Sequence, residues 1–102
     1  MTLLALFFAG AFLLNAIPHL AAGTLGLECP TPFAKPSGIG MSSPLVNFAW
    51  GTFNLVVGIV LLALHPVPDV FSLEAGAILA GFVLLGLYLA RHFGKVREGK
   101  LT

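Results

Sequence analysis

The sequence predicts an all-α integral membrane protein with three transmembrane helices and a long first loop. Of its 102 residues, 58% are hydrophobic and only 9% are charged, whereas a typical soluble domain is about a quarter charged. Three apolar segments, at about 3–22, 45–64 and 73–90, are long enough to cross a hydrocarbon core of about 30 Å as helices. None alternates apolar and polar residues as the strands of a membrane barrel do. We therefore expect one transmembrane helical domain, 1–102.

The first segment, 3–22, carries an unusual polar motif, NAIPHL at residues 15–20. Only two residues precede the segment and neither is basic, so we expect a retained helix rather than a secretory signal peptide. Asn15 and His19 lie four positions apart and therefore share one face of a helix. Pro18 has no backbone N–H, so it leaves one carbonyl of the preceding turn without its helical partner. The motif predicts polar groups close to the end of this helix.

The first loop, 23–43, contains four glycines and three prolines. Such a composition prevents a regular helix or a central strand. Unstructured connections of this length are often functional or disordered. Because apolar residues recur along it, we expect the loop to fold back against the helix ends; a flexible surface linker is the alternative. Cys29 is the only cysteine, so we expect a free thiol and no internal disulfide.

The second predicted helix carries a stripe of small and polar residues. At 100° per residue, Asn47, Gly51, Asn54 and Gly58 fall within about 60° of one another. Glycines on such a stripe let a neighbouring backbone approach closely, and asparagines hydrogen-bond across the contact. Trp50 flanks the stripe near one end, where we expect the indole to act as an interface anchor.

The third predicted helix contains two pairs of small residues at i, i+4 spacing. These pairs are Gly76 with Ala80 and Ala77 with Gly81. Pairs of this kind permit close helix packing and often mark contacts between membrane helices. We therefore expect these residues to pack helices together, either within the chain or between copies.

Basic residues are distributed unevenly along the chain. Positive residues near spans tend to stay in the cytoplasm, and this predicts a cytoplasmic first loop at 23–43, a basic cytoplasmic tail at 91–102 and an N-terminus outside. The expected location is the bacterial inner (plasma) membrane, with Arg91 as a second interface anchor. The tail is short and contains Glu98, so we expect no nucleic-acid binding. The five basic residues are Lys35, Arg91, Lys95, Arg97 and Lys100.

This topology brings polar residues of all three helices to the cytoplasmic end. They would form a polar intramembrane cluster covered by the first loop, and either fix the helix register through hydrogen bonds or line a path for a solute. His19 could serve as a proton relay or simply cap carbonyls at the interface. The predicted members are Asn15, His19, Asn47, Asn54, Tyr88 and His92.

The sequence offers little catalytic chemistry. We find no Ser/His/Asp arrangement and no paired carboxylates, so we expect no catalytic residues and no cofactor. A metal site needs three or four suitably spaced ligands, and with three histidines and one cysteine in the whole chain we expect none.

Three functions fit these observations. The first is a helix-packing or regulatory subunit of a homo- or hetero-oligomeric membrane complex. The second is an oligomeric channel or facilitator for a small neutral or weakly charged solute, lined by the asparagines. The third is a membrane enzyme or lipid-binding protein that uses His19, although an enzyme is the less expected outcome. The partners expected are the lipid bilayer and either further copies of the chain or a larger membrane protein.

Overall fold

The computed structural model describes residues 1–100 and shows an all-α fold with two very short strands. Each of the three helices is long and apolar enough to cross a membrane, which confirms the predicted fold class. The elements in order are α1 (Thr2–Thr24), β1 (Cys29–Pro30), β2 (Met41–Ser42), α2 (Pro44–Leu64) and α3 (Leu73–Arg97).

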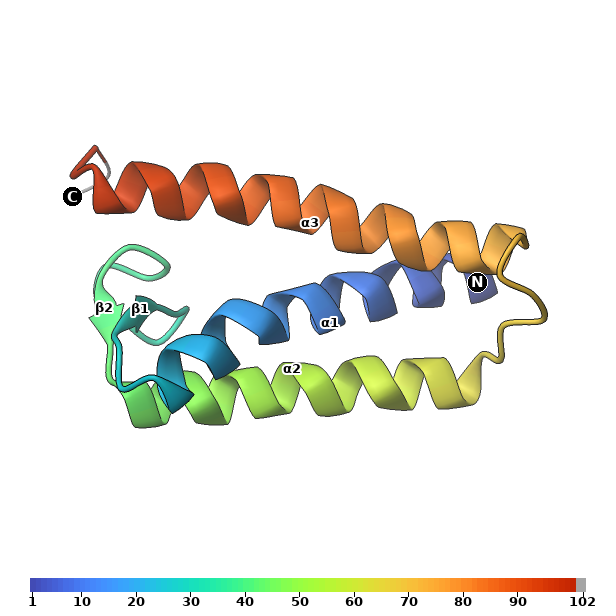
Figure 1. Ribbon diagram of the computed structural model, residues 1–102, viewed down its shortest axis with the longest axis horizontal. Helices are drawn as coiled ribbons and strands as arrows, with labels where there is room; N and C mark the ends of the chain where they lie inside the picture. The colour runs from blue at the N-terminus through green and yellow to red at the C-terminus, as the bar shows by residue number, and fades with distance from the viewer. Residues whose placement is uncertain (101–102) are drawn as a thin grey trace.

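The three helices form a layer with α1 in the middle (Figure 1). α1 packs against both α2 and α3, while α2 and α3 have almost no direct contact with each other. The burial follows from this order, because the buried side chains of α1, such as Leu6, Ala9 and Ala16, lie between the two outer helices. In α3 only Gly81 and Val96 are buried. Most of the buried side chains therefore surround α1, where it contacts α2 and α3.

The connection between α1 and α2 contains a short antiparallel ladder that the sequence analysis did not anticipate. Cys29 pairs with Ser42, and Pro30 pairs with Met41. Proline is tolerated here because both strands are edges, where a missing N–H does not break a continuous ladder. The hydroxyl groups of Thr31 and Ser42 are hydrogen-bonded at 2.5 Å. The segment therefore lies folded against the helix ends.

The two later helices begin at serine caps and α3 extends beyond its apolar span. The Ser43 hydroxyl accepts a hydrogen bond from the N–H of Val46 at 3.2 Å, and Ser72 does the same for Ala75 at 3.1 Å. α3 continues past residue 90 to Arg97. Hydropathy marks only the apolar part of a helix, whereas lysine and arginine are good helix formers that prolong it. The first residues of the predicted tail are therefore helical.

The two ends of the molecule differ in charge. The ladder of β1 and β2 lies at the same end as the C-terminus of α3, and the N-terminus lies beside the connection between α2 and α3 at the other (Figure 1). The five basic residues belong to the β1–β2 connection and to the last part of the chain. They therefore gather at one end of the helical layer.

Candidate functional site

Two side-chain hydrogen bonds join α1 to α2 near the basic end. Asn15 Nδ2 donates to Asn54 Oδ1 at 3.0 Å. One turn further along α1, His19 Nδ1 lies 2.7 Å from Asn47 Oδ1. Asn47, Asn54 and His19 are at most 2% exposed. Because hydrocarbon offers no hydrogen-bond partners, these pairs satisfy groups that the bilayer cannot.

Asn47 also holds the segment that contains the two strands. Its Nδ2 lies 3.0 Å from the carbonyl oxygen of Cys29 and 3.1 Å from those of Ser42 and Ser43. Carbonyl oxygens only accept hydrogen bonds, so the NH₂ group of the amide faces them. The amide oxygen of Asn47 therefore faces His19, and one side chain ties α2 to both α1 and the connecting segment.

This arrangement determines which nitrogen of His19 carries a proton. Since Asn47 Oδ1 can only accept, His19 Nδ1 must donate, and in the neutral imidazole Nε2 then keeps its lone pair. Within residues 1–100, Nε2 has no hydrogen-bond partner. The rings of Trp50 and Phe93 meet the imidazole edge-on, with centroids 6.5 and 6.1 Å away. His19 is thus held where α1, α2 and α3 converge.

Tyr88 and His92 lie close to these residues but bond elsewhere. His92 Nε2 donates to the carbonyl oxygen of Gly38 at 2.6 Å. The ring of Tyr88 stacks on that of His92 with a centroid separation of 5.6 Å and an angle of 10°. The structure thus brings four of the six predicted cluster residues into two hydrogen-bonded pairs, with Tyr88 and His92 as a separate stacked pair. That the six act together in function stays a prediction.

A cavity of about 160 Å³ lies beneath the connecting segment. Four of the six predicted residues line it, namely Asn15, His19, Tyr88 and His92, whereas Asn47 and Asn54 do not. No acidic or basic side chain other than histidine lines it, so the walls are neutral or aromatic. The other lining residues are Pro30, Thr31, Pro32, Ser37, Gly38, Trp50, Leu89 and Phe93.

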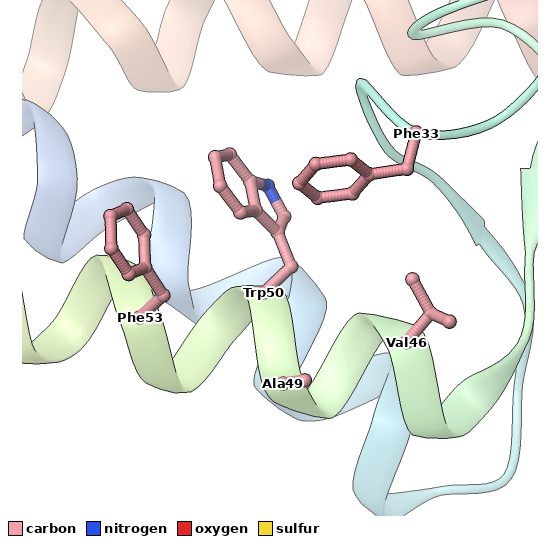
Figure 2. A pocket seen from close by; sticks show the side chains of 5 residues that line it. All are labelled: Phe33, Val46, Ala49, Trp50 and Phe53. Atoms are coloured by element: carbon pink, nitrogen blue, oxygen red, sulfur yellow. The ribbon is translucent and has the colours of Figure 1, made fainter.

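An apolar groove of about 350 Å³ is lined by Trp50 and four other side chains (Figure 2). Phe33 meets the indole edge-on at 5.1 Å, and Phe53 stacks on its other side at 5.7 Å. Val46 and Ala49 complete the lining. Every lining side chain except that of Phe33 comes from α2, so the connecting segment closes one side of a groove on this helix.

Trp50 carries an unpaired hydrogen-bond donor. Its Nε1 is the one buried side-chain nitrogen or oxygen without a partner in the described part of the chain. Leaving a buried donor unpaired costs about 1–3 kcal/mol. In Figure 2 the nitrogen lies on the edge of the indole that faces Phe33. The sequence gives no sign of this unpaired donor, because Phe33 lies 17 positions before Trp50 in a segment without a periodic pattern. That Trp50 anchors the protein at the membrane interface stays a prediction.

Glycines set the distance between α1 and α2. A Cβ atom on Gly51 would lie 2.8 Å from Leu20 Cγ, and one on Gly58 would lie 2.7 Å from the side chain of Leu13. The structure therefore places these two predicted packing residues against α1. Gly23, which sequence reasoning did not single out, faces Phe48 in the same way.

The contact between α1 and α3 also depends on glycines. A Cβ atom on Gly81 would collide with the backbone carbonyl of Phe7, and one on Gly10 would collide with that of Ile78. Gly81 was among the predicted packing residues, whereas Gly10 was missed because no second small residue marks its face of α1. These two glycines let the backbones of the two helices touch.

The remaining predicted packing residues of α3 are not buried against the rest of the chain. A Cβ atom on Gly76 would meet nothing within 4 Å. Gly76 and Ala80 are exposed, and Ala77 is partly exposed. The pair formed by Gly76 and Ala80 thus lies on the exposed surface of α3.

The thiol of Cys29 is enclosed beside the basic end of α3. Cys29 is 2% exposed. Burial raises the pKa of the thiol above its ordinary value, and the positive charge of Arg97 opposes this increase. The thiol is therefore protonated and poorly reactive at neutral pH.

Arg91 lies on the outer surface of α3 at the basic end. It lines a pocket of about 230 Å³ with Tyr88, His92 and Lys95. Its long side chain is exposed, which leaves the predicted role as an interface anchor open to test.

The chemistry of the region is that of hydrogen bonding and apolar contact. Over residues 1–100 there is no group of three or more histidine, cysteine or acidic residues that could hold a metal ion. The fold and the site define a class only, a small three-helix membrane protein. No family model, curated protein or solved structure matches the chain.

Proposed function

We propose that the protein is a helix-packing or regulatory subunit of a homo- or hetero-oligomeric membrane complex. The observation that carries this proposal is the outer surface of α3. Only 6% of its most apolar 18-residue stretch is buried within the chain, and Gly76 and Ala80 lie exposed on that surface. Small residues let a second helix approach closely, whereas lipid gains nothing from them.

The outer face of α2 provides an internal comparison. Its exposed side chains include Val56, Ile59 and Val60, which are about half exposed and bulky. Such side chains suit contact with lipid tails. α3 also exposes bulky side chains, but it adds a glycine and an alanine one turn apart, Gly76 and Ala80. This pair favours α3 over α2 as the contact surface.

A facilitator lined by the asparagines has less support. The amide groups of Asn47 and Asn54 are at most 1% exposed and are engaged in hydrogen bonds within the chain. They are therefore not presented to a passing solute.

The clustering of basic residues at one end supports the proposed location in a bacterial inner membrane with that end in the cytoplasm.

Native mass spectrometry of the tagged protein, extracted gently from its own membrane, tests the proposal. We expect either an integer multiple of 10.7 kDa or a stoichiometric second polypeptide. The double variant Gly76→Ile, Ala80→Ile should dissociate that complex. The matched control Val56→Ile, Val60→Ile adds bulk to the outer face of α2 and should leave it intact. A wild-type protein found only as a 10.7 kDa monomer would overturn the proposal.

A further inference from the structure

A pocket of about 230 Å³ lies on the outer surface of α3 at the basic end. Its lining consists of Tyr88, Arg91, His92 and Lys95, which follow one another over two turns of the helix. Tyr88, Arg91 and Lys95 are exposed. The arginine and the lysine both carry a positive charge at neutral pH. The pocket therefore presents two positive charges to the surroundings of the helix.

No carboxylate within residues 1–100 pairs with either of these two charges. The salt bridge of this part of the chain joins Lys100 to Glu98 at 2.8 Å, and Glu98 is the acidic residue nearest in sequence to both Arg91 and Lys95. Arg91 and Lys95 stand four positions apart on one helix, where two like charges repel each other. An anion bound between them would offset that repulsion.

A second pocket at the same end has a different balance of charge. It has a volume of about 320 Å³ and is lined by residues of α1, of the connecting segment and of α3. It combines the positive charge of Arg97 with the negative charge of Glu28, so the two offset part of each other. The surplus of positive charge thus belongs to the pocket of Arg91 and Lys95 rather than to every basic residue of this end.

The position of the pocket along α3 matches the boundary of the bilayer. The apolar stretch of α3 ends at Ala90, so Arg91 is the first residue beyond it. Tyr88 precedes Arg91 by one turn, and tyrosine is enriched where hydrocarbon meets headgroups. Arginine and lysine side chains extend their charged ends from this level into the headgroup layer. We therefore expect the charges of Arg91 and Lys95 to lie among the lipid phosphates.

Exposed leucines continue the same face of α3 towards the middle of the membrane. Leu87 and Leu84 precede Arg91 by four and seven positions, so at 100° per residue they lie within about 40° of it around the helix. They are 65% and 57% exposed. A molecule with an anionic group at Arg91 can therefore lay a hydrocarbon chain along α3.

The aromatic side of the pocket is held in place by contacts within the chain. His92 Nε2 donates to the carbonyl oxygen of Gly38 at 2.6 Å, which ties the imidazole to the connecting segment. The ring of Tyr88 stacks on this imidazole. Side chains that are already fixed lose less conformational freedom when a ligand binds. The arrangement therefore favours a defined site over a diffuse layer of charge.

We propose that this pocket binds the headgroup of an anionic phospholipid, with the phosphate between Arg91 and Lys95 and the acyl chains along Leu84 and Leu87. Arginine offers a phosphate two parallel N–H groups, and the lysine ammonium adds a point charge. A zwitterionic lipid also has a phosphate, but its ammonium group would find no carboxylate among the side chains of residues 1–100 that line the pocket. The lining comes from one chain, so the site does not rest on the proposed assembly.

Native mass spectrometry of the wild-type protein, released from detergent micelles, measures its affinity for single lipids. The protein is titrated with phosphatidylglycerol, phosphatidylcholine and phosphatidylethanolamine that carry the same acyl chains. We expect phosphatidylglycerol to bind roughly 25-fold more tightly than the other two, since each cation near a membrane surface adds about fivefold. Equal affinity for the three lipids would overturn the proposal. Displacement of phosphatidylglycerol by an equimolar amount of inorganic phosphate would also overturn it, because the site would then recognise the free anion.

Three variants test whether the preference arises in this pocket. Arg91→Gln and Lys95→Gln should each weaken the binding of phosphatidylglycerol about fivefold and leave that of phosphatidylcholine unchanged. Arg97→Gln is the matched control, because it removes one positive charge from the same end but outside this pocket; it should bind as the wild type does. Circular dichroism checks that each variant is folded, and if one of the two pocket variants fails to fold the other decides. Wild-type affinity in a folded pocket variant, or an equal loss in Arg97→Gln, would contradict the site.

Discussion

At the scale of single residues, Asn47 holds the basic end together. Its oxygen faces α1 through His19, and its nitrogen faces three carbonyl groups of the connecting segment and of the start of α2. Asn54, two turns along the same helix, bonds only to Asn15 and to the carbonyl of Trp50. Two asparagines on one stripe therefore carry different shares of the stability.

Replacing each asparagine by leucine should reveal this difference. Asn47→Leu leaves the N–H of His19 unpaired and removes the amide donor from the carbonyl oxygens of Cys29 and Ser42. It should therefore lower the free energy of unfolding by roughly 2–4 kcal/mol. Asn54→Leu should lower it by about 1 kcal/mol, the usual range for one hydrogen bond between membrane helices. Unfolding by dodecyl sulfate in mixed micelles, followed by circular dichroism, measures both; equal losses would contradict the assignment.

The buried thiol of Cys29 should react slowly and with an unusual pH dependence. Its pKa in the folded protein lies above that of the unfolded chain, because burial disfavours the thiolate. The thiol therefore contributes fully to the free energy of unfolding below its ordinary pKa, and this contribution is lost as the pH rises through the raised pKa, since the unfolded chain ionises first. Because the folded thiol is also buried and protonated, alkylation by iodoacetamide should be slow at pH 7–8 compared with the denatured chain. Equal rates in the two states would show that the thiol is exposed.

At the scale of elements, α1 organises the fold because both outer helices pack on it. The close approach of α3 to α1 depends on glycines, but not every glycine of α3 lies at that contact. Gly81 touches the backbone of Phe7, whereas Gly76, on the same helix, faces open space. Identical substitutions at these two positions should therefore have unlike consequences.

Gly81→Leu should push α3 off α1 and destabilise the chain by roughly 3 kcal/mol or more, since overpacking forces backbone movement. Gly76→Leu should leave the thermal unfolding of the isolated chain within about 1 kcal/mol of the wild type, since nothing lies in its way. Thermal unfolding of both variants in the same detergent makes the comparison. If Gly76→Leu were the more damaging of the two, the packing described for α3 would be wrong.

The sequence carried enough information for the helices and for part of the site. Apolar length determined the three helices, and the 3.6-residue period placed Asn47 and Asn54 on one face. The position of the connecting segment could not be obtained in this way, because the contacts of Phe33 and Gly38 join residues far apart in sequence. The unpaired indole nitrogen follows from those contacts, so it was equally out of reach.

At the scale of the whole molecule, we expect the separation of charge between the two ends to set the orientation in the membrane. All five basic residues lie in the β1–β2 connection or in the chain from Arg91 onward. We therefore expect a C-terminal reporter enzyme to be active in the cytoplasm. Replacing Lys35, Arg91 and Lys95 by glutamine while adding lysines beside Asp69 should invert a fraction of the molecules. A wild-type fusion whose reporter is active only outside would contradict this orientation.

The central place of α1 also has a consequence for biogenesis. α1 and α2 leave the ribosome before α3, and between them they hold both side-chain hydrogen bonds of the helix interface and the two paired strands. This hairpin can be complete in the membrane while α3 is still being synthesised. α3 would then dock onto the exposed side of α1, so we expect the order of assembly to follow the order of translation.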